Sequence, residues 1–474
     1  MYKMWLNALV VLTLSLFPST AIAEEKQQEL VNKLAERTYT GDLDEIRQRK
    51  VLRALVVYSK TDFFFTDELH PKGLQADLLQ QLDKSLNAGI KQQELKTIIN
   101  YIPTTFDNLL NDLEVGRGDI AAHLLTITPE RKKRVNFATS GALKVNELVV
   151  AHKDVLDINK PEDLAGRTVY VLKGSSYEEH LRELNANLNK MGLVPVTIIA
   201  ADPRLRSEDI MELVNAGAVK LTIIDDYKAK LWSRVLPDIQ VLENVIIKAD
   251  TTVGWAVRKN NPKLLESLMA LTKTVKKGSL IGNMFFKSYY HSTKWIDNPL
   301  SDEKRAKLLD LIDLFKKYAG KYSFDYLALA AQAYQESQLD HSRISPAGAL
   351  GIMQLLPSTA ADPNINIADI KELENNIHAG VKYMDYIRNR YYSDPEIAEE
   401  DKLAFSWASY NAGPANVRRM RQLAAEMGLN SNIWFNNVEM AAGKIVGRET
   451  VQYVSNIFKY YIAYNLIRDR IDAL

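Results

Sequence analysis

The chain has 474 residues, of which 46% are hydrophobic and 25% charged, a length that allows two or three globular domains with well-buried cores. A formal net charge of +1, with both signs interspersed, excludes the basic stripe of a nucleic-acid-binding protein. The absence of cysteine excludes disulfides, thiol catalysis and a lipid-bearing cysteine.

The first 23 residues have the pattern of a secretory signal peptide. Lys3 precedes an apolar run over 6–17, and Ala-Ile-Ala at 21–23 supplies small residues for cleavage. The apolar run is too short to span a bilayer comfortably, although a retained anchor is the alternative. We therefore expect an exported protein whose mature chain begins with a lead-in over 24–47.

Residues 48–290 alternate strand-like apolar runs with helical stretches, which predicts an α/β fold with mostly parallel sheets. The strand candidates are 52–58, 97–102, 119–124, 148–151, 168–172, 196–200 and 221–224.

Three passages in this region carry more than periodicity. They are Gly-Leu-Gln-Ala-Asp-Leu at 73–78, Gly-Arg-Gly-Asp-Ile at 116–120, and Thr-Ile-Thr-Pro-Glu-Arg at 126–131. Together they resemble the family 3 extracellular solute-binding proteins, which are two-lobed traps for amino acids. The resemblance implies a periplasmic-binding-protein fold with a second lobe over about 146–250.

The same resemblance implies a ligand site between the lobes. Arg131 would grip a ligand carboxylate, for which guanidinium geometry is suited, and Thr126 would add a hydroxyl. From the second lobe, Ser175 and Ser176 would receive an anion at a strand end, and Asp225 would face an ammonium group. The alternative for Arg131 is a solvated basic turn.

After a linker over 291–304, residues 305–474 have the pattern of an all-α domain. The helix candidates are 303–318, 324–336, 349–356, 367–391, 401–410, 414–427 and 449–470. Ser323 is the expected N-cap of the second helix, and Glu336 ends that helix on a face shared with Leu329 and Ala333. Burial on this apolar face would raise the pKa of Glu336, whereas a solvent-facing carboxylate is the plainer alternative.

Four motifs follow one another in this half of the chain. They are Glu-Ser at 336–337, Gly-Ile-Met-Gln at 351–354, Ala-Ser-Tyr-Asn-Ala-Gly at 408–413 and Glu-Thr-Val-Gln-Tyr-Val at 449–454. Their order and spacing resemble the catalytic domain of the soluble lytic transglycosylases. That resemblance implies a lysozyme-like fold and cleavage of the β-1,4 bond between N-acetylmuramic acid (MurNAc) and N-acetylglucosamine (GlcNAc) in peptidoglycan.

The implied product is a 1,6-anhydro-MurNAc end, formed with Glu336 as acid and then as base. An ordinary glycosidase instead sets two carboxylates across the bond. The resemblance places six further residues at the substrate: Ser345, Met353, Gln354, Tyr410, Asn411 and Tyr453. Glu449 is a candidate second acid, with a structural ion pair as its alternative.

No cofactor or metal is expected, because the seven histidines are scattered without a ligand cluster. The order of the two modules resembles a class of membrane-bound lytic transglycosylases, which implies a periplasmic enzyme, peripheral on the inner face of the outer membrane. Its implied partners are peptidoglycan strands and, at the N-terminal module, an amino acid, stem peptide or muropeptide. The competing functions are a lysozyme-type hydrolase and a receptor with an inactive catalytic domain.

Overall fold

The computed structural model describes residues 38–59, 62–65, 71–139, 144–274, 300–446 and 448–472. The predicted signal peptide over 1–23 lies outside these ranges, as does most of the predicted linker over 291–304. Within the ranges, no helix combines the length and apolar character needed to cross a membrane.

The first lobe is built around one strand that is buried along its whole length. A central strand, β1 (Val51–Val56), pairs in parallel with β2 (Ile98–Pro103) and β3 (Ile120–Thr126). Inside β1, Arg53 is fully buried and bonds Asp119 at 2.8 Å, so its charge is balanced within the core. The helices of this lobe are α2 (Leu43–Arg49), α3 (Leu74–Leu86), α4 (Leu109–Glu114), α5 (Pro129–Arg134) and α9 (Pro262–Thr274).

The second lobe joins the first through one long strand, β9 (Ile239–Arg258). Its first half pairs with β5 (Lys144–His152), and its second half pairs with β3 and with β4 (Val135–Ala138). The other elements of the lobe are β6 (Thr168–Val171), β7 (Thr197–Ala200), β8 (Leu221–Asp225), α6 (Ser176–Lys190), α7 (Ser207–Asn215) and α8 (Asp226–Trp232).

The expectation of mostly parallel sheets is wrong. The described strand pairs β1–β2, β1–β3 and β6–β7 are parallel, whereas every pairing of β9, and that of β5 with β8, is antiparallel. Sequence reasoning missed β9 because Glu243, Lys248 and Asp250 interrupt its apolar run. A strand whose middle is exposed does not show the continuous pattern of a buried one.

The second domain is all-helical, and its helices lie close to the predicted ranges. They are α11 (Asp302–Tyr322), α12 (Tyr326–Ser337), α13 (Pro357–Ala360), α14 (Leu373–Tyr391), α15 (Glu399–Ala412), α16 (Pro414–Glu426), α17 (Glu439–Ile445), α18 (Arg448–Leu466) and α19 (Arg468–Asp472). A π-helical segment, Trp434–Val438, precedes α17. The π-helical segment, α13 and α17 were not predicted.

Two local predictions in this domain are wrong. Ser323 is not the N-cap of α12: it ends α11 in the left-handed conformation, and Asp325 caps α12 by accepting from the Leu327 N–H at 2.9 Å. The predicted helix over 349–356 is instead a set of turns with isolated bridges, because Gly351 adopts a φ of +75° that breaks a helix.

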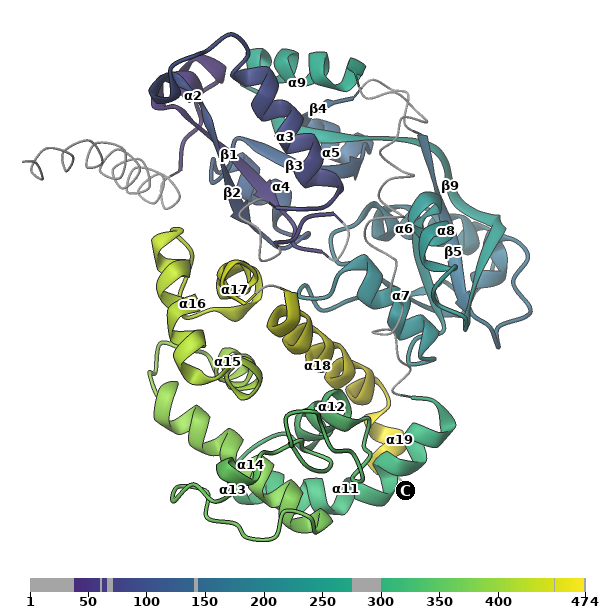
Figure 1. The fold of residues 1–474 in the computed structure, drawn as a ribbon. Coiled ribbons are helices and arrows are strands. Elements are labelled where there is room, and N and C mark those ends of the chain that lie inside the picture. The colour runs from purple at the N-terminus through teal and green to yellow at the C-terminus, as the bar shows by residue number, and fades with distance from the viewer. Residues whose placement is uncertain are drawn as a thin grey trace, which may run out of the picture.

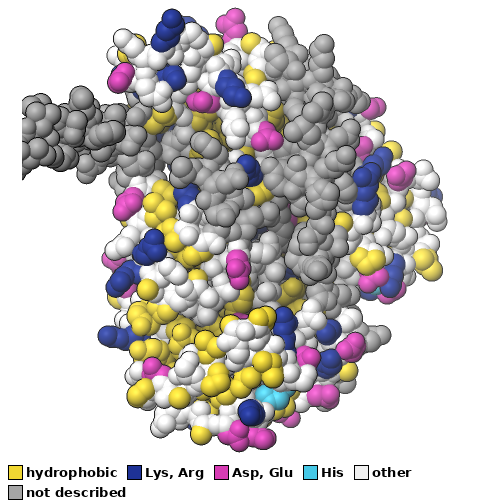
Figure 2. All heavy atoms as spheres, viewed as in Figure 1, with side chains coloured by type: hydrophobic (Ala, Val, Ile, Leu, Met, Phe, Trp, Pro, Cys, Tyr) yellow, Lys and Arg dark blue, Asp and Glu magenta, His cyan; other side chains and the backbone are white. Residues whose placement is uncertain are grey.

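The two-lobed module and the helical domain lie against each other (Figure 1), with α7 of the second lobe contacting α18. Helix α18 also packs on α12, α15 and α17, so it is central to the helical domain. In the face shown in Figure 2, charges of both signs are interspersed, and hydrophobic side chains gather over the helical half. The predicted fold class, a two-lobed α/β module followed by an all-α domain, is confirmed.

Candidate active site and sensing cleft

A cleft of about 430 Å³ opens at the C-terminal end of α12. The side chains that line it come from α12, the loop after α12, the end of α15 and one face of α18. They are Tyr334, Gln335, Glu336, Gln338, Arg343, Asn411, Glu449, Gln452, Tyr453, Asn456 and Tyr460.

The carboxyl of Glu336 has an environment that favours its protonated form. Burial raises the pKa of this group from 4.5 to about 7, while the Tyr453 hydrogen bond and the nearby charge of Arg343 act in the opposite direction. Tyr453 donates its hydroxyl to Glu336 Oε1, which fixes the carboxyl between α12 and α18. Glu336 is therefore an acid that can both give and take a proton near neutral pH.

The wall of the cleft carries amide groups. Asn411 Oδ1 accepts from the Thr450 hydroxyl at 2.7 Å, and the Gln452 amide donates to Asn456 at 2.7 Å. These bonds hold the amide side chains in fixed orientations along the wall of the cleft. Gln452 and Arg343 were missed by sequence reasoning, although the first adjoins Tyr453 and the second lies in the glycine-punctuated loop after Glu336.

Four other predicted substrate residues lie outside the set of cleft-lining side chains. The Tyr410 hydroxyl donates to the Met353 carbonyl at 2.8 Å, and Met353 itself is fully buried. The Gln354 amide donates to the carbonyl of Arg343 at 3.0 Å, and the Ser345 hydroxyl accepts from the Ala349 N–H at 3.0 Å. The structure places these four residues where they hold the loop after α12. The charge of Glu336 contributes to raising the pKa of Tyr410, so that ring lies near the acid.

Glu449 is the other carboxylate among the described residues that line this cleft, and it is exposed at the start of α18. Across the described part of the chain, no group of three His, Asp or Glu side chains is arranged to hold a metal ion. His341 instead lies 2.6 Å from the Lys371 carbonyl, and the ring of His378 stacks on Tyr318.

In the N-terminal module, Arg131 joins the two lobes. Its guanidinium is buried and donates to the Thr126 carbonyl and to the Gly174 carbonyl of the second lobe, both at 2.9 Å. Glu179 lies 3.5 Å away. The solvated alternative for Arg131 is thus excluded, and the guanidinium lies between the lobes as a ligand-gripping residue would.

The predicted residues of the second lobe gather around this arginine. Tyr177 donates to Asp225 at 3.1 Å, and burial raises the pKa of Asp225 to about 7. The Ser176 hydroxyl donates to Glu147 at 2.6 Å, whereas the buried Ser175 hydroxyl has no hydrogen-bond partner among the described residues. Glu147 was not predicted, because it lies inside an apolar strand.

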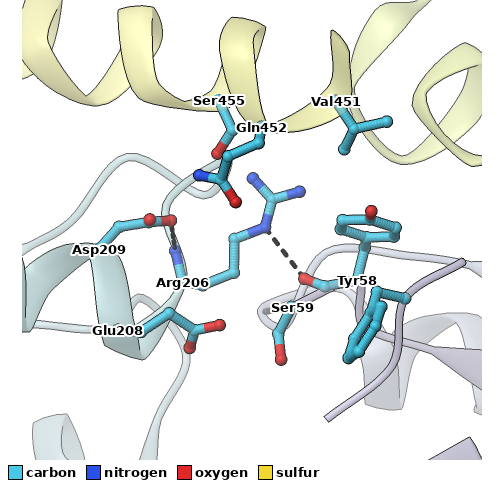
Figure 3. Close-up of a pocket in the computed structure, with 9 residues that line it drawn as sticks. Tyr58, Ser59, Arg206, Glu208, Asp209, Val451, Gln452 and Ser455 are labelled. Atoms are coloured by element: carbon cyan, nitrogen blue, oxygen red, sulfur yellow. Dashed lines mark hydrogen bonds between the residues drawn. The ribbon is translucent and has the colours of Figure 1, made fainter. Parts of the chain in front are cut away.

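Where the module meets the helical domain, Arg206 of the second lobe lies between Tyr58 of the first lobe and Gln452 of α18 (Figure 3). Its Nε donates to the Tyr58 carbonyl of the first lobe at 3.0 Å, and its Nη2 donates to Glu439 of α17 at 3.0 Å. Gln452 of α18 lines the small cavity beside this arginine and also lines the catalytic cleft. A second buried ion pair joins Lys459 of α18 to Glu212 of α7.

Known proteins match both halves of the chain. Bacterial extracellular solute-binding proteins, family 3, match residues 53–286, and the transglycosylase SLT domain matches residues 313–433. Among solved structures, an ancestral arginine-binding protein bound to arginine aligns with a TM-score of 0.40 and 22% identity, over 51% of this chain and 98% of that chain.

Two relatives extend over most of the chain. A membrane-bound lytic murein transglycosylase F of Desulfosudis oleivorans is 29% identical, covering 88% of this chain and 90% of the relative. A protein of the same name from Photobacterium profundum is 26% identical, covering 89% and 81%. These relatives, the two family matches and the order of the two modules agree: the chain has the fused architecture of the membrane-bound lytic murein transglycosylases F and is a lytic transglycosylase with a solute-binding-protein-like module.

Proposed function

We propose that the protein cleaves the MurNAc–GlcNAc β-1,4 bond of peptidoglycan and leaves 1,6-anhydro-MurNAc ends, with Glu336 acting alone as acid and base. The observation that carries this proposal is the Glu336 carboxyl, whose pKa is raised to about 7 and which lines a cleft of about 430 Å³. Such a group is protonated in a useful fraction at neutral pH, and its conjugate base is equally accessible.

In the first step, protonated Glu336 donates its proton to the glycosidic oxygen as the bond from that oxygen to the muramyl C1 breaks. The leaving GlcNAc takes the oxygen as its O4 hydroxyl, and Glu336 becomes a carboxylate. In the second step, the carboxylate accepts the proton of the muramyl C6 hydroxyl as O6 bonds to C1. The acid is restored, and no water is consumed.

The C6 hydroxyl is favoured over water because it belongs to the sugar that it attacks. A tethered nucleophile has a high effective molarity when the bound ring places it near C1. The hydroxyl of Tyr453 would hold the carboxylate for the second step, since a donated hydrogen bond stabilises the charged form.

One observation favours a second candidate, a lysozyme-type hydrolase. Glu449 lines the same cleft and would serve as a base for water in a two-carboxylate mechanism. Mass spectrometry of digested sacculi separates the two, because an anhydro end is lighter than a hydrolysed end by one water.

Two variants complete this experiment. We expect Glu336→Gln to lose at least about 10²-fold in activity, the loss typical of a missing general acid, while Glu449→Gln keeps the anhydro product. Reducing-end products, or loss of activity in both variants, would replace the proposal with the hydrolase. Unchanged digestion by Glu336→Gln would refute both mechanisms.

We also infer that the N-terminal module senses an amino acid, stem peptide or muropeptide and changes the turnover of the enzyme. The convergence of Arg131, Asp225 and the Ser175 hydroxyl between the lobes supports a small ligand with a carboxylate and an ammonium group. The contacts of Arg206 with both lobes and with α17 supply a route by which lobe movement would reach the helical domain.

The test uses the full-length enzyme with a panel of amino acids, stem peptides and muropeptides. We expect one of them to bind and to change turnover of soluble glycan strands by about fivefold or more. In Arg206→Gln, binding should persist while the change in turnover is lost. Arg182→Gln, which removes an exposed second-lobe arginine, should respond as the wild type does. If no compound binds or alters turnover, the sensing proposal fails.

We infer a periplasmic location, with peripheral association at the outer membrane. The signal-like pattern over 1–23 supports export, and the relatives are named membrane-bound. Cell fractionation with and without residues 2–23 tests this inference, and a protein that stays in the cytoplasm with its leader intact would contradict it.

A further inference from the structure

Arg343 is a cation in the catalytic cleft that the mechanism above does not use. It lines the cleft together with Glu336, and it lies close enough for its charge to influence the pKa of that acid. Among the described residues, Glu449 included, its guanidinium has no hydrogen-bond or ion-pair partner. An arginine in a ligand cleft that is not engaged by the protein is available to a ligand.

The backbone of Arg343 is held by hydrogen bonds within its loop, although its side chain has no bonded partner among the described residues. Its carbonyl accepts from the Gly351 N–H at 2.9 Å and from the Gln354 amide at 3.0 Å. These bonds fold the loop back on itself, with Ile344 bridged to Leu350. The loop therefore holds the backbone of Arg343 at a set position, so that little backbone order is lost when a ligand binds the side chain.

We propose that Arg343 determines substrate specificity by binding a carboxylate on the muramyl side of the bond that Glu336 protonates. This inference depends on the proposed function, because it takes a muramyl sugar as the occupant of the cleft. A muramyl sugar offers carboxylates from two sources: the lactyl group, which is charged only when no peptide is attached, and the stem peptide. Guanidinium and carboxylate form paired, charge-assisted hydrogen bonds.

Carboxylate binding would also favour the protonated form of Glu336. In the free enzyme, the positive charge of Arg343 favours ionised Glu336. A bound carboxylate neutralises that charge, so the proton on Glu336 is held to higher pH once substrate is present. Binding of the substrate would thereby keep Glu336 protonated, which is the form that cleavage of the bond requires.

The first measurement is equilibrium binding in the inactive Glu336→Gln background, so that it does not depend on the chemistry. Three soluble glycan strands serve as probes: peptide-free strands, peptide-bearing strands, and peptide-free strands whose lactyl carboxyl has been converted to a methylamide. Adding Arg343→Gln should weaken binding about five- to tenfold for one of the two charged strands and leave the neutral strand unchanged. The strand that is affected identifies the source of the carboxylate.

Arg343→Lys should recover part of the lost affinity, since it keeps the charge without the planar pair of donors. Arg47→Gln is the matched control, because Arg47 is exposed on α2 in the other module. Equal affinities for all three strands with and without Arg343, or the same loss on the neutral strand, would overturn the proposal.

The second measurement is the pH profile with Glu336 intact. For the wild type, we expect the alkaline limb of kcat to lie at higher pH than that of kcat/KM, because the first reports the complex and the second the free enzyme. In Arg343→Gln the two limbs should coincide. A gap that persists unchanged in the variant would contradict the link between Arg343 and the acid. Anhydro ends on wild-type products test the proposed function separately.

Discussion

The hydrogen bond from Tyr453 to Glu336 gives a quantitative prediction for Tyr453→Phe. The hydroxyl stabilises the carboxylate form, so its removal should raise the pKa of Glu336 further above its present value of about 7. A hydrogen bond to a charged group contributes about 1.5–3 kcal/mol, and about 1.4 kcal/mol corresponds to one pKa unit. Because water in the cleft replaces part of the lost bond, we expect a shift of about one unit.

The assay is the rate of soluble product release from sacculi between pH 5 and 9. Activity requires protonated Glu336 at the start of the reaction, so the alkaline midpoint should move to higher pH in the variant. Tyr410→Phe is the matched control, because that hydroxyl also lies near the acid but donates to a backbone carbonyl. A midpoint that stays in place or moves to lower pH in Tyr453→Phe would refute the role given to this hydroxyl.

Three further predictions concern stability. Glu336→Gln should melt at a higher temperature than the wild type at pH 8 but not at pH 4. The reason is that the pKa of this carboxyl is 4.5 in the unfolded chain and about 7 in the folded protein. The stability of the wild type therefore falls as the pH rises through this window, whereas that of the variant does not. The variant should gain at most about 3 kcal/mol in free energy of unfolding. A stability difference between variant and wild type that is the same at pH 4 and pH 8 would contradict this prediction. Gly351→Ala should lower the free energy of unfolding in urea by about 1–3 kcal/mol, because φ is +75° and the added Cβ would meet the Asn376 amide at 2.6 Å; a neutral result would show that the loop can shift. Lys459→Met should lower the free energy of unfolding by about 3 kcal/mol in the same assay, because it removes the cation beside buried Glu212. Adding Glu212→Leu should recover most of this loss. A double variant that is as unstable as Lys459→Met would argue against the ion pair.

Much of the helical domain could be predicted because its helices carry clear hydrophobic patterns. Pro414 begins α16 as expected, and the Glu-Thr-Val-Gln-Tyr-Val motif lies on α18 with Tyr453 directed at Glu336. The raised pKa of Glu336 could also be predicted, since Leu329 and Ala333 share its helix face. These features depend on local spacing, which a sequence displays directly.

The features that were missed depend on contacts between distant segments. The strand β9 looks irregular alone and becomes a strand only through its partners in two lobes. In the sequence, Arg343 looks like any other loop arginine, and only the fold places it near Glu336. The partners of Arg206, Tyr58 and Glu439, are 148 and 233 residues away from it in the chain. Tertiary placement of this kind leaves no periodic signal in the sequence.

Because α18 makes contacts in both halves of the protein, we expect the helical domain to be less stable when it is separated from the N-terminal module. The same helix forms one wall of the catalytic cleft, through Tyr453, and the surface that meets α7, through Lys459. In a fragment starting at α11, the buried charges of Lys459 and Glu439 would lose their partners in the N-terminal module and become exposed to solvent. Helix α18, which holds Glu336 through Tyr453, would also lose the residues that pack against it. Separating the halves therefore changes the enzyme itself, even where no ligand is involved.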